Sequence, residues 1–204
     1  MRVLDLFSGL GGFSEAFVLA GDEVCRVENN PLLAEVPYTS MDDVLNVRDR
    51  LVRYQEEGIP MREYDILLAS PPCHEFSLAF SAPQAQASRT GEFEDYDPDM
   101  TLVQAVLDII KITKPKYWII ENVRGSIRHF AKIGLEPRII NDAYVFYGNF
   151  PKFGHVEIPS KADKDTNSRD PLRSNRRALI PLPLSMAIRK AIVEQTSLFD
   201  FTSS

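Results

Sequence analysis

Short apolar runs recur along the first three quarters of the chain, and turn-forming residues separate them. Runs of this length and composition predict buried strands. The predicted strands are Met1–Phe7, Glu23–Val27, Tyr64–Ser70, Tyr117–Ile120 and Tyr144–Tyr147.

Segments of helical spacing lie between these strands. Phe13–Ala20 predicts a helix after a glycine-rich turn, Thr101–Thr113 predicts a second that Pro115 closes, and Ile180–Ile192 predicts a third. Strands that alternate with helices predict an α/β fold with a doubly wound, mostly parallel sheet. In such a sheet, ligands bind beyond the carboxyl ends of the strands.

Polar residues fill two segments that lack either period. Ser81–Pro98 mixes proline, glutamine, serine and acidic residues, and Glu157–Arg177 is rich in lysine, arginine and aspartate. We expect the first to be a long mobile loop and the second a polar loop, because long loops in a compact domain are usually functional or disordered. The residues after Gln195 are expected to fray.

Composition narrows the class of protein. The chain has 204 residues, 44% of them hydrophobic, which favours a single soluble domain spanning residues 1–204. Its two cysteines, Cys25 and Cys73, are too few for a disulfide scaffold or a thiolate zinc site, and we expect no metal site. No apolar run reaches the roughly 18 residues of a membrane span. Asp5 also interrupts the position of a secretory segment, so we expect a cytoplasmic protein with no membrane partner.

Charge is divided unevenly along the chain. Residues 1–123 carry 10 Lys and Arg against 21 Asp and Glu, whereas residues 124–190 carry 13 against 6. The second part would attract a polyanion and the first would repel it. A nucleic-acid contact is therefore sought in the basic part, although a solvated basic loop explains the same charge.

The first candidate site follows the first predicted strand. Asp5-Leu-Phe-Ser-Gly-Leu-Gly-Gly12 ends that strand and opens a helix, and its glycines allow positive φ and close approach of a ligand. Glu28 ends the second strand, where an acidic residue can hold the two ribose hydroxyls of an adenosine cofactor. The glycine spacing differs from the NAD fingerprint. The two features together predict a nucleotide-containing cofactor other than NAD.

Two further candidates follow later strands. Ser70-Pro-Pro-Cys-His-Glu-Phe-Ser77 presents Cys73 at the carboxyl edge of the sheet, where a lowered pKa would make the thiol a nucleophile. Cys25 lies among valines inside a strand and is expected in the core. Glu121, in Glu121-Asn-Val123, ends another strand at the same edge and could bond a ring nitrogen of a heterocycle; a surface carboxylate is the alternative.

In this order and at these strand ends, the three motifs resemble those of the DNA cytosine carbon-5 methyltransferases, whose fold is Rossmann-like. The resemblance covers residues 1–123. Asp5–Ser14 is similar to the family's S-adenosylmethionine loop, Ser70–Ser77 to its Pro-Cys nucleophile motif, and Glu121–Val123 to its Glu-Asn-Val motif. Asp43 matches, less specifically, an acidic residue near the adenine amine.

The resemblance implies a chemistry and a set of residues. Cys73 would attack carbon 6 of a cytosine flipped out of double-stranded DNA, Glu121 would hold ring nitrogen 3, and carbon 5 would accept the methyl group. Ser81–Pro98 corresponds to the family's mobile catalytic loop. The implied S-adenosylmethionine-binding residues are Asp5, Phe7, Ser8, Gly9, Gly11, Gly12, Glu28, Asn29, Asp43 and Pro71.

Some residues depart from the family pattern. His74-Glu75 replaces Gln-Pro after the nucleophile, and Tyr144–Phe150 contains no arginine where the family has one that contacts the target base. Arg124 is our candidate for that contact, and Arg173, Arg176 or Arg177 are the alternatives. Ile180–Ile192 resembles the family's final motif or a core helix. We expect His74, His129 and His155 to be surface or loop residues without a catalytic role.

The largest departure is length, because only 81 residues follow Val123. Residues 157–177 are then the candidate for a reduced target-recognition segment, in which basic side chains contact phosphates and give affinity without sequence choice. We expect a short recognition sequence or a protein partner that reads the target. The basic candidates are Lys161, Lys164, Arg169, Arg173, Arg176 and Arg177.

Three other functions are considered against the same residues. A cytosine carbon-5 methyltransferase acting on RNA, such as tRNA, would need the same motifs. An amino-methylating DNA enzyme would carry an aromatic residue where Cys73 stands. A non-catalytic S-adenosylmethionine- or DNA-binding subunit would bind cofactor without turnover, but retention of both Cys73 and Glu121 argues against it.

Overall fold

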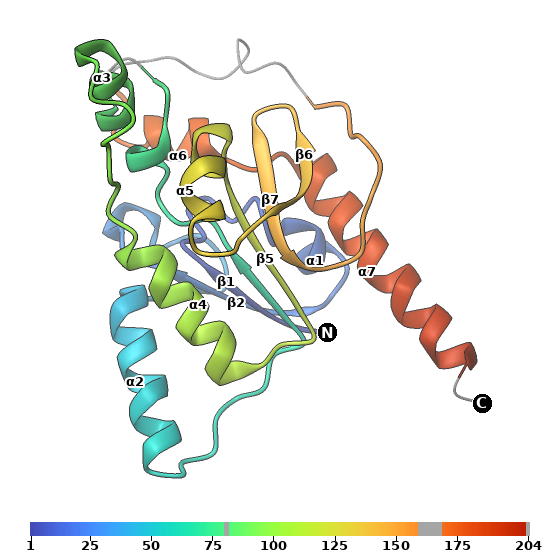
Figure 1. The fold of residues 1–204 in the computed structure, drawn as a ribbon. Helices are drawn as coiled ribbons and strands as arrows, with labels where there is room; N and C mark the ends of the chain where they lie inside the picture. Colours follow the sequence, from blue (N-terminus) through green and yellow to red (C-terminus); the bar gives the residue numbers. More distant parts are fainter. Residues whose placement is uncertain (80–81, 159–168, 203–204) are drawn as a thin grey trace.

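Seven strands form one sheet in the computed structural model, which describes residues 1–79, 82–158 and 169–202 (Figure 1). Their spatial order is β3-β2-β1-β4-β5-β7-β6. The strands are β1 (Arg2–Leu6), β2 (Glu23–Glu28), β3 (Thr39–Met41), β4 (Ile66–Ala69), β5 (Tyr117–Val123), β6 (Pro137–Asn141) and β7 (Tyr144–Asn149).

The first five strands are parallel, and strand order reverses between β1 and β4. The predicted doubly wound, mostly parallel sheet is therefore confirmed. β7 is antiparallel to both β5 and β6. A connection of two residues, Asp142 and Ala143, joins β6 to β7, and so short a link permits only a hairpin. The sequence predicted a strand at Tyr144–Tyr147 but neither β6 nor the antiparallel direction.

Helices cover both faces of the sheet (Figure 1). α2 and α4 pack on the face that includes Leu67 and Ala69 of β4, and α1 and α7 pack on the face of Ile66 and Leu68. All four β4 residues are fully buried, as expected of a central parallel strand. The helices are α1 (Glu15–Leu19), α2 (Val44–Glu56), α3 (Pro83–Thr90), α4 (Thr101–Thr113), α5 (Ile127–Ala131), α6 (Arg173–Ala178) and α7 (Leu182–Thr202), with 3-10 turns η1 (Pro31–Leu33), η2 (His74–Phe76) and η3 (Arg124–Ser126).

Two predicted loops contain helices, which corrects the sequence interpretation. In Ser81–Pro98, Pro83 begins α3 and Gly91 ends it with φ of 83°. Proline at a helix start costs no hydrogen bond, and a left-handed glycine closes the last turn. In Glu157–Arg177, residues 173–177 belong to α6, whereas 159–168, with Lys161 and Lys164, lie outside the described residues. Ser81 also lies outside them.

The C-terminal helix is longer than its apolar spacing predicted. α7 begins at Leu182 and continues to Thr202, through the tail that was expected to fray after Gln195. Within the described part of the chain, no helix has the length and apolar character needed to cross a bilayer.

Candidate functional site at the carboxyl edge of the sheet

The loop between β1 and α1, residues 7–14 and here called the glycine loop, turns sharply at the point where strand order reverses. Gly9 and Gly11 have φ of 54° and 80°, and Phe7 has φ of 58°. A bulky residue in the left-handed region costs about 1–3 kcal/mol and marks a segment under strain. Such strain is typical of ligand-binding turns at a topological switch point.

Glu28 fixes the start of the glycine loop from the end of β2. Its carboxylate accepts hydrogen bonds from the backbone N–H groups of Gly9 at 2.8 Å, Asn29 at 3.0 Å and Asn30 at 2.8 Å. These bonds occupy three of roughly four acceptor positions. Glu28 therefore lies where the sequence predicted it, but it holds protein backbone and has room for about one further bond.

The glycines of this loop have different surroundings. Close approach of a ligand, which was expected of all of them from the sequence, therefore does not explain every one. Among the described residues, a Cβ on Gly9 would meet only the Asn175 side chain, at 3.8 Å, so this backbone is open to a ligand. A Cβ on Gly11 would lie 2.4 Å from the Arg26 guanidinium carbon, and one on Gly12 would lie 2.4 Å from the Ile180 carbonyl oxygen. Protein atoms therefore fill the space beside Gly11 and Gly12.

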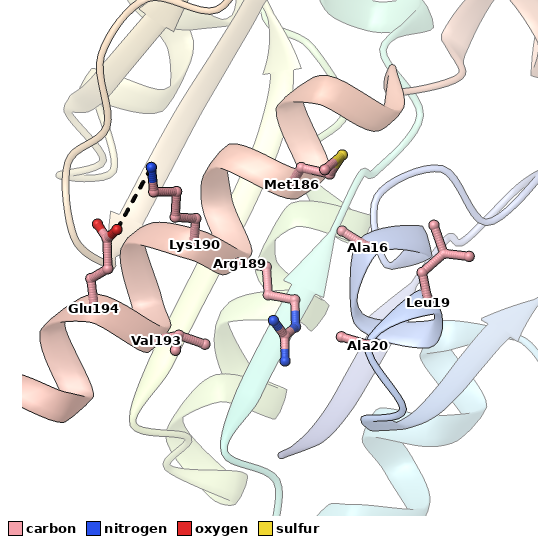
Figure 2. A pocket seen from close by; sticks show the side chains of 8 residues that line it. All are labelled: Ala16, Leu19, Ala20, Met186, Arg189, Lys190, Val193 and Glu194. Carbon is pink, nitrogen blue, oxygen red and sulfur yellow. Dashed lines mark ion pairs between the residues drawn. The ribbon is translucent and has the colours of Figure 1, made fainter.

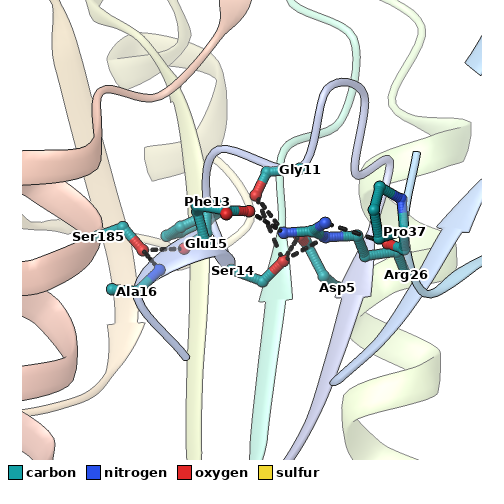
Figure 3. Close-up of polar contacts among 9 residues, drawn as sticks. All are labelled: Asp5, Gly11, Phe13, Ser14, Glu15, Ala16, Arg26, Pro37 and Ser185. Carbon is teal, nitrogen blue, oxygen red and sulfur yellow. Dashed lines mark hydrogen bonds and ion pairs between the residues drawn. The ribbon is translucent and has the colours of Figure 1, made fainter. Parts of the chain in front are cut away.

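A buried polar network lies beneath the glycine loop (Figure 3). Ser14 donates a 2.6 Å hydrogen bond to Asp5 and accepts one of 2.9 Å from Arg26. Burial, opposed by the Ser14 hydrogen bond and the Arg26 charge, raises the pKa of Asp5 to about 6. Asp5 thus lies under the loop, fully buried, and its other oxygen has no hydrogen-bond partner among the described residues.

Asn29 and Asp43 meet at the ends of β2 and β3. The Asn29 amide donates to the Asp43 carboxylate at 2.9 Å, and the other Asp43 oxygen accepts from the Leu45 N–H at 2.8 Å, which caps α2. Aspartate is one of the preferred residues at the N-cap of a helix. The structure brings these two sequence-predicted residues together beside Glu28.

The turn that carries Cys73 is joined to the Glu-Asn-Val motif. Ala69 of β4 pairs with Ile120 of β5, so the segments that follow them leave the sheet side by side. The Asn122 amide donates to the Pro71 carbonyl at 3.1 Å in a buried position. Cys73 lies half-buried at the start of η2. The two motifs are therefore fixed against each other, as the sequence predicted from their strand ends.

Gly125 allows a second close contact between these motifs. A Cβ at this position would lie 1.9 Å from the Phe76 carbonyl oxygen. Because real Cβ atoms do not approach oxygen so closely, any larger residue would push η2 and η3 apart. Glycine is thus required where the turn after Cys73 crosses the turn after Glu121.

Glu121 lies almost fully buried beside two tyrosines of β7. Burial and the Glu121 charge raise the pKa of Tyr144 to about 12, and burial raises that of Tyr147 to about 12 with a smaller contribution from Glu121. The Tyr144 hydroxyl donates to the Leu179 carbonyl at 3.2 Å. This carboxylate therefore emerges in a protected environment at the same edge as Cys73.

Arg124 lies in surroundings different from those of Glu121, which is almost fully buried. Arg124 is exposed on η3, and its Nε donates a 2.5 Å hydrogen bond to the Asp142 carbonyl in the β6–β7 turn. The alternatives Arg176 and Arg177 are exposed on α6, and Arg173 is half-buried there. The Asn175 amide of α6 lies 3.8 Å from the position that a Cβ on Gly9 would occupy, which places α6 beside the glycine loop.

The segment of α3 is docked on α5 by buried side chains. The Gln84 amide oxygen lies 2.9 Å from His129 Nε2, and its nitrogen donates to the Gly125 carbonyl at 3.4 Å. Tyr96 donates to the Glu75 carboxylate at 2.7 Å. His129 is only 2% exposed, which corrects its expected surface position, whereas His74 and His155 are exposed. Phe76 of η2 and Tyr96, which follows α3, contact the imidazole ring and explain its burial.

Cys25 is also less buried than expected. It is half-exposed on β2 and packs against the core cluster on the α2 face. Burial raises the pKa of its thiol.

A surface cavity of about 450 Å³ lies elsewhere, between α1 and α7 (Figure 2). None of the sequence-predicted site residues lines it. Its lining consists of Ala16, Leu19, Ala20, Met186, Arg189, Lys190, Val193 and Glu194.

Comparison with known proteins adds an independent line of information. The family model described as C-5 cytosine-specific DNA methylase matches residues 1–142. The chain is 31% identical over 134 residues to the type II methyltransferase M1.HphI of Haemophilus parahaemolyticus, covering 63% of this chain and 34% of that protein.

Two other relatives match the same part of the chain. Identity is 28% over 130 residues to the type II methyltransferase M.DdeI of Desulfomicrobium norvegicum, covering 62% of this chain and 29% of that protein. It is 31% over 134 residues to the orphan methyltransferase M.Rho11sI of Bacillus phage rho11s, covering 63% and 24%. The chain thus spans between a quarter and a third of the length of these relatives.

Proposed function

Because this chain belongs to the C-5 cytosine-specific DNA methylase family, we propose that it transfers a methyl group from S-adenosylmethionine to carbon 5 of cytosine in double-stranded DNA. One observation carries the proposal. The Asn122 bond to Pro71 joins the turn of Cys73 to the strand of Glu121, at the same sheet edge as the glycine loop. A nucleophile, an acid and a cofactor loop are three of the groups that this reaction needs.

The residues at the ends of β1 and β2 fit the cofactor. Gly9 offers open backbone, and Glu28 retains acceptor capacity beside it. The hydroxyls of Ser8 and Ser70, at the ends of β1 and β4, have no hydrogen-bond partner among the described residues. Unpaired polar groups at a ligand edge favour a polar ligand. When bound, S-adenosylmethionine supplies the methyl group.

The residues of this chain then have distinct roles. The Cys73 thiolate forms a bond to carbon 6 of a flipped-out cytosine, and the electron pair of the 5,6 double bond shifts toward carbon 5. Glu121 donates a proton to ring nitrogen 3, which stabilises the developing charge. After methylation, a base removes the proton of carbon 5, the 5,6 double bond returns, the Cys73 sulfur leaves and the proton on ring nitrogen 3 returns to Glu121. The segment of α3 covers the base and excludes water.

The basic residues that follow β7 are the candidates for target recognition. We propose that residues 157–177 are a reduced recognition segment within one catalytic domain of residues 1–204, and that Arg169, Arg173, Arg176 and Arg177 contact phosphates. Arg124 or an arginine of α6 would contact the target base. Phosphate contacts give affinity without base choice. The recognised sequence is therefore short, or a protein partner reads it.

A trapping experiment tests the thiol mechanism. Wild type and Cys73→Ala are incubated with S-adenosylmethionine and DNA duplexes that carry 5-fluorocytosine, whose fluorine cannot leave as a proton does. We expect a denaturation-resistant protein–DNA adduct with the wild type and none with Cys73→Ala. Cys25→Ala is the matched control and should form the adduct like the wild type.

The other outcomes separate the rival functions. An adduct that Cys73→Ala also forms would contradict the role of Cys73. No adduct on DNA, together with an adduct on tRNA carrying 5-fluorocytosine, would make RNA the substrate. No adduct on either, with S-adenosylmethionine still bound, would favour a non-catalytic subunit.

A further inference from the structure

Arg26 is a charged residue buried inside an apolar strand. It lies on β2 between Cys25 and Val27, and it is only 1% exposed. Burying a guanidinium is costly unless nearly all of its N–H groups are bonded. Its position two residues before Glu28 places both side chains on the same face of the sheet, because strand side chains alternate.

The guanidinium is bonded at every nitrogen (Figure 3). Its Nε donates to the Ser14 hydroxyl at 2.9 Å, and one terminal nitrogen donates to the Gly11 carbonyl at 2.8 Å and to the Glu15 carboxylate at 2.7 Å. The other terminal nitrogen donates to the Pro37 carbonyl at 3.1 Å. One planar group thus joins the glycine loop, the start of α1 and the segment before β3.

The contacts of Arg26 hold the part of the glycine loop that Glu28 does not hold. Glu28 holds Gly9 at the start of the glycine loop, and Arg26 holds Gly11 and Ser14 in its second half. The guanidinium also occupies the space that a side chain on Gly11 would need. The conformation of the loop is therefore fixed from β2 at both ends.

We propose that Arg26 is a positioning residue that holds the glycine loop in the conformation that binds S-adenosylmethionine. The inference rests on the proposed cofactor and adds the residue on which the shape of its loop depends. Arginine suits this role because its planar fork serves several acceptors in fixed directions, whereas lysine provides one compact charge on a flexible stem.

Cofactor binding measured without DNA tests this role. Titration calorimetry with S-adenosylmethionine is compared for wild type, Arg26→Lys and Arg26→Gln, with the melting temperature measured in parallel. We expect the Kd to rise about tenfold or more in both variants, because the loop loses bonds on which its conformation depends. Arg62→Gln is the matched control: Arg62 pairs with Glu23 at the other end of β2, is exposed, and should leave the Kd unchanged.

Other results would contradict the positioning role of Arg26. A Kd within about twofold of the wild-type value in folded Arg26→Lys or Arg26→Gln, with only a lower melting temperature, would reduce Arg26 to a structural role and overturn the inference. Should both variants fail to fold, Ser14→Ala decides, since it removes one acceptor of Arg26 and should raise the Kd several-fold. A wild-type chain that binds no S-adenosylmethionine would overturn the cofactor and this inference together. A wild-type chain that binds S-adenosylmethionine but does not methylate DNA would contradict the proposed function and leave the test of Arg26 unchanged.

Discussion

Asp5 is a buried carboxyl group beneath the glycine loop, and its raised pKa makes the stability of the fold depend on pH. It is fully buried on β1, and burial raises its pKa from 3.8 to about 6 in spite of the Ser14 hydrogen bond and the Arg26 charge. In the unfolded chain the same group ionises near its ordinary value. A raised carboxyl pKa means that the folded state binds the proton more tightly than the unfolded state does.

The contribution of Asp5 to stability therefore falls as pH rises. This contribution is fully present below about pH 4 and is lost between about pH 4 and pH 6. Above about pH 6 it does not change further. Asp5→Asn removes this titration and keeps an oxygen for Ser14. Between about pH 4.5 and pH 7.5, the variant should gain roughly 2 kcal/mol in unfolding free energy relative to the wild type.

Urea unfolding at the two pH values measures this difference. Asp49→Asn, which changes an exposed carboxylate on α2, is the control and should show no such gain. A difference between Asp5→Asn and wild type that stays constant with pH would contradict the raised pKa of Asp5.

At the scale of elements, the proposed reactive edge is assembled where short turns cross. η2 carries the segment after Cys73, η3 carries the segment after Glu121, and Gly125 lets them touch at the Phe76 carbonyl. The buried Gln84 then joins α3 to both α5 and η3. The distance between Cys73 and Glu121 thus depends on contacts between elements rather than on either motif alone.

Gly125→Ala is expected to separate these turns without unfolding the protein. Its φ does not require glycine, so the effect arises from the Cβ that would lie 1.9 Å from the Phe76 carbonyl oxygen. A shift of about 1 Å at a reacting group costs roughly 100-fold in rate. We expect methyl transfer to fall by about that factor while S-adenosylmethionine binding is retained.

A radiolabelled methyl-transfer assay checks this expectation. Gly154→Ala is the control, because no atom of the described residues lies within 4 Å of its Cβ position, and it should retain full activity. Wild-type activity in Gly125→Ala would mean that the turns can separate without moving Cys73 relative to Glu121.

For the whole molecule, the C-terminal helix completes the site that the N-terminal part begins. The family match ends at residue 142, yet Gly12 packs against the Ile180 carbonyl and Tyr144 bonds the Leu179 carbonyl. Ser185 of α7, fully buried, donates to the Phe13 carbonyl at 2.6 Å and accepts from the Ala16 N–H at 3.1 Å (Figure 3). Residues far beyond the matched part thus support the glycine loop.

Ser185→Ala should destabilise the fold through this connection. It leaves a buried carbonyl and a buried N–H without a partner, which costs about 1–3 kcal/mol in unfolding free energy. Urea unfolding measures the loss, and Ser88→Ala, at an exposed position on α3, should change the free energy by less than about 0.5 kcal/mol. Equal stability of Ser185→Ala and the wild type would show that α7 does not hold α1 through this hydroxyl.

The sequence alone determined the elements and the reactive residue types. Apolar runs and helical spacing depend on neighbouring residues, and glycine and proline mark turns locally, so β1, β2, β4, β5 and the motifs at their ends could be predicted. The parallel order of these strands also follows from their alternation with helices. For the same reason, Cys73, Glu121 and Glu28 could be expected at one edge of the sheet from the sequence alone.

Only the tertiary structure decided how those residues are held. Arg26 serves the glycine loop because the sheet brings β2 beside β1, and Ser185 supports α1 from 169 residues away from Ala16. His129 is buried because α3 and η2 close over it, which its own segment does not encode. Of these residues, only Arg26 had a local signal in the sequence, because it is a charged residue inside an otherwise apolar run. The remainder arises from long-range packing, in which each side chain's burial and partners depend on segments distant in sequence.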